Sequence, residues 1–191
     1  MHALEPYFNW RHIYTSDEDE LSPFYGKEYN EFQYHETIYN YYIHPQWDGI
    51  GSPTLYIKII YTDYIHGYAI MELLGEWNDC HENDVMLLKR EIIDVLIKNK
   101  VNKFLLIGEN VLNFHFDDDD YYQEWREDVD ETDGWITLMN FRDHIIEELD
   151  ANGMRNYLNY GNTFNQVDWR TLKPNELCDA VDEQLMMRID G

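Results

Sequence analysis

The chain has 191 residues, which is enough for one domain with a sizeable hydrophobic core. It carries 38 acidic and 14 basic residues, a formal net charge of −24, and this excess excludes sequence-independent binding to nucleic-acid phosphates. The content of 44% apolar and 16% aromatic residues distinguishes it from disordered acidic chains, so we expect a folded protein.

Residues 1–33 are polar and acidic with scattered aromatic side chains, and we expect them to form an extension that lies on a single domain spanning 34–191. Twelve of the sixteen tyrosines precede residue 69, which favours tyrosine-rich strands in this half. The segment 34–44, YHETIYNYYIH, predicts a strand that Pro45 ends, because proline cannot donate to a strand ladder.

The clearest strands are predicted at 54–63 and 68–77, two β-branched and aromatic segments whose short connection indicates a hairpin. Asp79, followed three residues later by Glu82, predicts an N-cap with a capping box. The helix that starts there should continue to about residue 99, since its apolar side chains recur at helical spacing on one face.

The C-terminal half alternates short apolar segments with helical ones. KFLLIG at 103–108 and WITLM at 135–139 are continuous apolar runs, typical of strands that are covered on both faces. Helices are expected at 118–129, from about 140 to Gly153, and from Pro174 onward. The sequence therefore predicts an α/β fold: a mixed β-sheet with helices packed against it.

Four consecutive aspartates, Asp117, Asp118, Asp119 and Asp120, are the candidate ligands for a hard cation such as calcium or magnesium. Adjacent side chains do not converge on one point, so a solvated acidic loop is the alternative. An EF-hand alignment on Gly134 fails, because Asn140 then occupies the position of the bidentate glutamate. The His-Glu pairs at 35–36 and 81–82 lack the second histidine of a zinc protease.

Cys80 is the candidate reactive thiol. It falls in the first turn of the predicted helix beside His81, where the helix dipole and an imidazole lower a thiol pKa. The alternative is a partly buried small residue next to a helix cap. Cys178 shares an apolar helical stripe with Val181 and is expected in the core.

No segment matches a phosphate-binding loop, and no serine lies in a nucleophile elbow, so the sequence predicts no cofactor. Carboxylate pairs for acid/base chemistry are too numerous for the sequence to single out one pair.

The charge is unevenly distributed along the chain. Residues 109–150 contain fifteen acidic residues and two arginines, a net charge of −13, whereas residues 83–103 have a net charge of +2. This polarity has two interpretations: the favoured one is a solvated, highly charged face, and the other is docking by charge of a basic protein partner or a second copy of this chain. The candidate interaction residues are Asp117, Asp120, Trp125, Lys89, Arg90 and Lys98.

The first ten residues lack the basic start and apolar run of a secretory signal, and no apolar run approaches 18 residues. The two cysteines lie far apart in the sequence, which fits a reducing compartment. We therefore expect a cytoplasmic protein that does not bind membranes.

The order hairpin, helix, KFLLIG strand, helix, WITLM strand and helix, across about residues 54–152, resembles the STAS fold of sporulation anti-anti-sigma factors. The resemblance implies a non-catalytic module whose helical face engages a partner or a small apolar ligand. Switch members of that family carry a phosphorylatable Ser or Thr after the strand that matches KFLLIG. Here Glu109 and Asn110 follow that strand, so the phosphorylation switch does not carry over.

These observations favour a non-enzymatic binding or regulatory module that acts through its surface. Two alternatives stay open at this point. One is an enzyme of unknown class, such as a hydrolase that uses carboxylates. The other is an acidic mimic of nucleic acid that occupies a basic protein.

Overall fold

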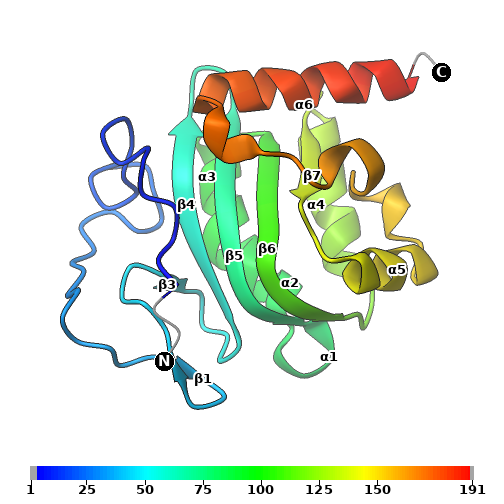
Figure 1. The fold of residues 1–191 in the computed structure, drawn as a ribbon. Coiled ribbons are helices and arrows are strands. Elements are labelled where there is room, and N and C mark those ends of the chain that lie inside the picture. The colour runs from blue at the N-terminus through cyan, green and yellow to red at the C-terminus, as the bar shows by residue number, and fades with distance from the viewer. Residues whose placement is uncertain (1–3, 190–191) are drawn as a thin grey trace.

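The computed structural model of the protein describes residues 4–189, and its centre is a five-stranded sheet (Figure 1). The strands lie in the order β3-β4-β5-β6-β7. The pairs β3–β4 and β4–β5 are antiparallel, and β5–β6 and β6–β7 are parallel. The strands are β3 (Asp48–Gly49), β4 (Leu55–Asp63), β5 (Tyr68–Asn78), β6 (Lys103–His115) and β7 (Trp135–Met139). The predicted mixed sheet with packed helices is confirmed.

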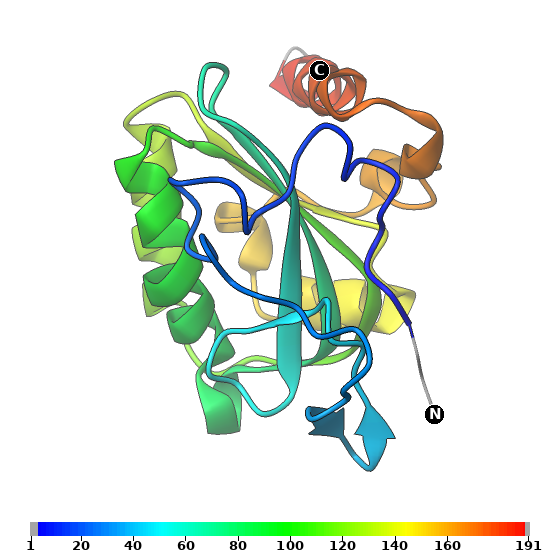
Figure 2. The ribbon, with the colours of Figure 1, turned by 90° about the vertical axis from the view of Figure 1, so that its left-hand side faces the viewer.

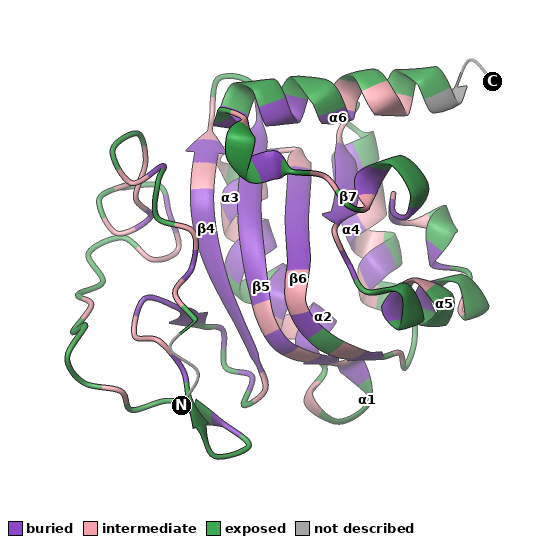
Figure 3. Cartoon of the chain, in the orientation of Figure 1, coloured by how far each residue is buried: buried purple, intermediate pink, exposed green. Residues whose placement is uncertain are grey.

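Helices cover one face of the sheet, as Figure 2 shows from the side. They are α1 (Asp79–Glu82), α2 (Asp84–Leu88), the π-helical turn η1 (Lys89–Ile93), α3 (Asp94–Lys98), α4 (Asp120–Asp130) and α5 (Asp143–Ala151). Trp77 and Phe104 from the strands and Trp125 from α4 are fully buried between the two layers. Figure 3 shows this buried band along the strands.

The helix predicted from Asp79 to Asn99 is present, but its start and its regularity differ from the prediction. The N-cap is Asn78, whose side chain accepts a hydrogen bond from the backbone N–H of His81. The predicted capping box at Asp79 is wrong, because that carboxylate turns into the core instead. Asn83 has a left-handed backbone (φ +53°) and separates α1 from α2.

The other face of the sheet is covered by α6 (Pro174–Ile189), by the short helices η3 (Asn162–Phe164) and η4 (Trp169–Thr171), and by the N-terminal extension. The short helix η2 (Met154–Asn156) instead packs its Met154 into the core under α2, α4 and α5. Trp10 of the extension is 5% exposed and packs edge-on against Trp169, with ring centroids 5.5 Å apart. The extension thus contributes to the core, although its described part, residues 4–33, contains no regular helix. Among residues 4–189, no helix combines the length and the apolar character needed to cross a membrane.

The segment 34–44 forms a small hairpin rather than the single predicted strand. Its strands are β1 (Thr37–Ile38) and β2 (Tyr41–Tyr42), which pair antiparallel. Tyr39 and Asn40 between them both have positive φ, as a type I′ turn requires. The prediction was wrong because β-propensity does not reveal that two tight-turn residues interrupt the segment.

Asp182 fixes α6 to the sheet. Its carboxylate accepts hydrogen bonds from Tyr68 Oη at 2.6 Å, from Trp135 Nε1 at 2.7 Å and from Lys103 Nζ at 2.9 Å, so three strands donate to one side chain. Burial raises the pKa of Asp182, but these donors outweigh burial and leave it below its ordinary value.

We expect Asp182→Asn to lower the free energy of unfolding by about 2 kcal/mol, because the amide nitrogen cannot accept from these donors. The measurement is urea unfolding at pH 7. Glu183→Gln is the matched control, since Glu183 is exposed on the same helix. Equal stability of the two variants would contradict the role given to Asp182.

Candidate functional site

Two ionisable side chains lie buried on the sheet face that the N-terminal extension covers. Lys58 of β4 and Glu72 of β5 are direct cross-strand partners, and they are 7% and 3% exposed. An unpaired buried charge is costly, so each of these side chains needs a partner. No ion pair joins the two among the described residues, and each side chain is satisfied by a different segment.

Lys58 is held by the extension. Its Nζ lies 3.3 Å from Asp48 Oδ2 and 3.9 Å from the centroid of the Tyr29 ring. Asp48 in turn accepts hydrogen bonds from Lys27 Nζ and Tyr29 Oη, both at 2.7 Å, and its side chain is fully buried. Burial lowers the pKa of Lys58, although Asp48 opposes that shift.

Glu72 and Glu109 are the two carboxyl groups that most resemble a catalytic acid/base pair. Glu72 accepts a 2.6 Å hydrogen bond from the backbone N–H of Tyr7, and burial raises its pKa to about 7. Glu109 accepts from Arg170, Asn140 and Trp169 at 2.6 to 3.1 Å. Burial raises the pKa of Glu109, but these donors outweigh burial and leave the pKa lowered. Arg170 Nη2 also lies 3.8 Å from Glu72.

Opposite pKa shifts in two neighbouring carboxyl groups are typical of acid/base catalysis. Glu72 is closed off, however, and only Glu109, whose side chain is 27% exposed, reaches the surface. Tyr7 packs edge-on against Trp10 and Trp169, with ring centroids 5.2 and 4.8 Å apart, and its hydroxyl donates to the Arg170 carbonyl. Neither glutamate lines any of the five clefts found on the described residues.

A second buried carboxylate, Asp79, has a structural role. It accepts hydrogen bonds from Tyr122 Oη at 2.6 Å, from the Val85 N–H at 2.8 Å and from Trp77 Nε1 at 3.0 Å. Burial raises its pKa to about 6. These contacts join the end of β5 to α2 and α4, and the group lines none of the clefts.

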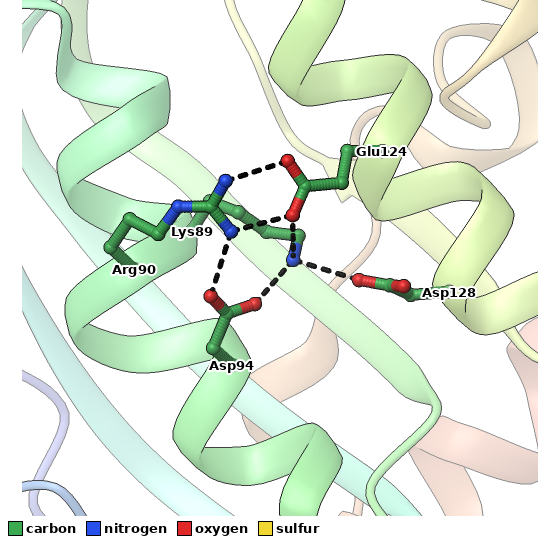
Figure 4. A network of polar contacts seen from close by, with 5 residues as sticks. All are labelled: Lys89, Arg90, Asp94, Glu124 and Asp128. Atoms are coloured by element: carbon green, nitrogen blue, oxygen red, sulfur yellow. Dashed lines mark hydrogen bonds and ion pairs between the residues drawn. The ribbon is translucent and has the colours of Figure 1, made fainter.

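Charged side chains of η1 and α3 meet acidic side chains of α4, as Figure 4 shows. The Lys89 side chain is fully buried, and its Nζ contacts Asp94, Glu124 at 3.3 Å and Asp128 at 2.8 Å. Arg90 adds bonds of 2.5 and 2.7 Å to Glu124. Burial lowers the pKa of Lys89, but the carboxylates outweigh burial and raise it.

This network corrects the predicted interaction surface. Lys89 and Trp125 are buried and cannot contact a partner, and Arg90 is held by Glu124. The sequence predicted that these basic and acidic groups attract groups of another molecule. They pair with each other within one chain instead, because α4 packs beside α2 and η1. Of the remaining candidates, Asp117, Asp120 and Lys98 are exposed, and the structure does not gather them into one surface with the others.

The aspartate run does not form a cation cage. Tyr157 Oη donates to Asp119 at 2.5 Å, and the Asp120 N–H donates to Asp118 at 3.3 Å. The one carboxylate group with metal-like spacing among the described residues is Asp94, Glu124 and Asp128, whose ligand oxygens lie within 4.8 Å of one another. The Lys89 ammonium lies against all three of these carboxylates.

Cys80 does not have the predicted lowered pKa. Its Sγ is exposed and donates to the Phe116 carbonyl at 2.8 Å. Local desolvation and the negative charges of Asp117 and Asp79 raise its pKa above the ordinary value. The prediction was wrong because the sequence pattern included the helix start and His81 but not the acidic segment that folds beside them.

A wide cleft is lined in part by the end of the extension. It measures about 570 Å³ and lies between residues 27–36 and 43–56. We call it the N-terminal cleft, and it is lined by Glu28, Tyr29, His35, Glu36, His44 and Tyr56, among others. Glu36 accepts a 3.1 Å hydrogen bond from Tyr56 Oη, whereas Glu28 is exposed and forms no hydrogen bond or ion pair with the described residues.

A second, smaller cleft of about 280 Å³ lies beside the β1–β2 hairpin. We call it the Arg142 cleft, and its walls include Leu4, Ile38, Tyr39, Leu74, Leu112 and Arg142. The two clefts share one wall residue, Ile43.

Exposed apolar side chains concentrate in the same region. Nine of the thirteen large apolar residues that are exposed on the described chain lie between Leu4 and Tyr42. Phe32 is 95% exposed and Tyr39 is 59% exposed. Composition already showed aromatic residues in the extension, but only the structure shows which of them stay outside the core.

A scan against protein-family models and searches of curated proteins and of solved structures found no match to this chain. The resemblance to the STAS fold therefore stays a prediction from the order of the elements.

Glu72 makes a testable contribution to the dependence of stability on pH. Since its folded-state pKa is raised, its stabilising contribution is complete below about pH 4.3 and is lost as pH rises through about 7. We expect the stability of Glu72→Gln relative to the wild type to increase by about 3 kcal/mol between pH 4 and pH 8. Chemical unfolding of both proteins at several pH values measures this difference in stability.

Glu109→Gln is the control of opposite sign. The pKa of Glu109 is lowered, so its contribution is present at neutral pH and is lost as pH falls through the folded-state pKa. A parallel pH dependence for the two variants would contradict this assignment.

We expect Lys89→Met to lower the free energy of unfolding by about 2 kcal/mol, because three carboxylates then face one another without the ammonium. Calcium at 5 mM should recover part of the loss by binding them. Melting temperatures with and without calcium measure both effects, and Lys98→Met, on an exposed lysine, is the control. Equal calcium shifts in the variant and the wild type would contradict the prediction.

Proposed function

We propose that the protein is a non-enzymatic binding module, and that its binding surface is the N-terminal extension together with the β1–β2 hairpin. The observation that carries this proposal is the concentration of exposed apolar side chains between Leu4 and Tyr42, in the part of the chain whose residues 27–36 line the N-terminal cleft. Large exposed apolar groups that are rimmed by polar residues are typical of interaction sites.

The chemistry of the N-terminal cleft favours a basic segment of a protein partner. Glu28 and Glu36 line the cleft, while the charge of Lys27 is engaged by Asp48. The net charge of −24 attracts a cationic partner over long range, and nearby aromatic rings such as Phe32 offer apolar and cation–π contacts. Carboxylates pair well with arginine, so an arginine- and leucine-containing segment fits this surface.

The enzymatic alternative is less favoured because neither of its best carboxylates is free to react. Glu72 and Glu109 have the pKa pattern of an acid/base pair, but Glu72 is buried and Glu109 is engaged by Arg170, Asn140 and Trp169. Mimicry of nucleic acid is also less favoured, since Glu124 and Asp128 of the acidic helix are neutralised by Lys89 and are not presented to a partner.

A labelled nine-residue peptide of alternating arginine and leucine tests the proposal. We expect fluorescence anisotropy to show binding at 50 mM salt that weakens at least tenfold at 300 mM salt, because screening reduces charge attraction. The same peptide with glutamate in place of arginine should not bind. The double variant Glu28→Gln/Glu36→Gln should weaken binding at least fivefold.

Glu127→Gln/Glu131→Gln is the matched control, since it removes the same charge from exposed positions on α4 and directly after it. An equal loss in both double variants would show that bulk charge binds the peptide. That result would overturn the assignment of the N-terminal cleft.

A further inference from the structure

The Arg142 cleft has an apolar interior that a sheet irregularity helps to build. The β5–β6 pairing shifts register between Glu72 and Leu74 and again between Gly75 and Glu76. Bulges of this kind bend strands and are common beside functional sites. Gly75 lines the cleft with φ +114°, and a Cβ there would meet Thr54 O at 2.0 Å and Ile38 Cδ1 at 2.8 Å. The irregular strand thus lets the hairpin approach closely.

Two polar side chains in this cleft have no partner among the described residues. Arg142, directly before α5, is exposed and has no carboxylate within 4.0 Å of its guanidinium. Asn110 of β6 is half-buried, and its carboxamide forms no hydrogen bond within residues 4–189. Most other cations of this acidic chain are paired, as Arg90 and Arg170 illustrate.

The charged residue that lines this cleft, Arg142, is positive, whereas the molecule has a negative net charge. No acidic residue lines it, although the chain has 38 of them. Glu76 lies beside Tyr39 of the cleft wall, and its carboxylate is already engaged by hydrogen bonds from Tyr39 and Asn113. An anion therefore meets a free guanidinium here, and repulsion from the remaining negative charge is screened beyond about 8 Å at physiological salt.

The walls restrict the kind of anion. Ile38, Leu74 and Leu112 contribute aliphatic surface, and Tyr39 contributes ring surface. Such walls do not solvate a small, fully hydrated ion, whereas a ligand with an apolar body gains by leaving water. A volume of about 280 Å³ lies at the small end of ligand pockets. Arginine pairs bidentately with a carboxylate, and an asparagine amide adds a further donor.

We propose that the Arg142 cleft binds a small-molecule carboxylate with an apolar body, such as a medium-chain fatty acid. The carboxylate lies against Arg142 and Asn110, and the hydrocarbon chain lies between Ile38, Leu74 and Leu112. This site adjoins the proposed binding surface and shares the β1–β2 hairpin and Ile43 with it, but neither Arg142 nor Asn110 lines the N-terminal cleft.

Octanoate is the probe, with 1-octanol and octylammonium as the neutral and cationic controls. We expect calorimetry on the full chain to show binding of octanoate that is at least tenfold tighter than binding of either control. In nuclear magnetic resonance spectra, octanoate should shift the Arg142 guanidinium and Asn110 carboxamide signals. Arg142→Gln should weaken octanoate binding at least tenfold, and Asn110→Asp should weaken it further by charge repulsion.

Lys173→Gln is the matched control, since Lys173 is another exposed cation without an ion-pair partner among the described residues. Equal octanoate affinity in Arg142→Gln and the wild type would overturn the proposal, as would the absence of binding at 10 mM. Binding of acetyl-Leu-Leu at least tenfold tighter than octanoate would also overturn it, because the occupant would then be a chain terminus.

Discussion

Burial of Lys58 and Glu72 on one face of the sheet is the constraint on which the arrangement of this protein depends. The two side chains are neighbours on adjacent strands, yet they do not pair with each other. Each buried charge would be costly alone. Asp48 and Tyr29 compensate Lys58, and the Tyr7 backbone with Arg170 compensates Glu72. Because Tyr7 and Tyr29 belong to the extension, compensation of these two side chains requires the extension to stay docked on the sheet.

This docking also explains where the proposed binding surfaces lie. A segment that is held at a few polar points cannot bury all its apolar side chains, and so aromatic residues such as Phe32 and Tyr39 stay exposed. The loops between the fixed points form the wall of the N-terminal cleft, and the hairpin forms a wall of the Arg142 cleft. The same contacts close off Glu72, and Trp169 donates a hydrogen bond to Glu109.

The sequence predicted much of the fold, for reasons that are local. The continuous apolar runs KFLLIG and WITLM became β6 and β7, and the hairpin of β4 and β5 was predicted within one residue at each end. The failures concern single residues, but their causes lie elsewhere in the chain. Asn78 rather than Asp79 caps the first helix, because the Asp79 carboxylate finds donors on Trp77 and Tyr122. One of these donors is more than forty residues away in sequence.

Composition and periodicity by themselves determined the fold class, the acidic character and the lack of a recognisable catalytic motif, because those properties depend on residue types and their spacing along the chain. Tertiary structure alone decided which charges are free. Lys89 and Arg90 looked available for a partner in the sequence, but Glu124 holds both of them. Arg142 looked unremarkable, and the fold leaves it unpaired beside an apolar cleft. The physical reason is that the availability of a charge depends on which groups lie within a few ångströms of it, and sequence spacing does not determine those distances.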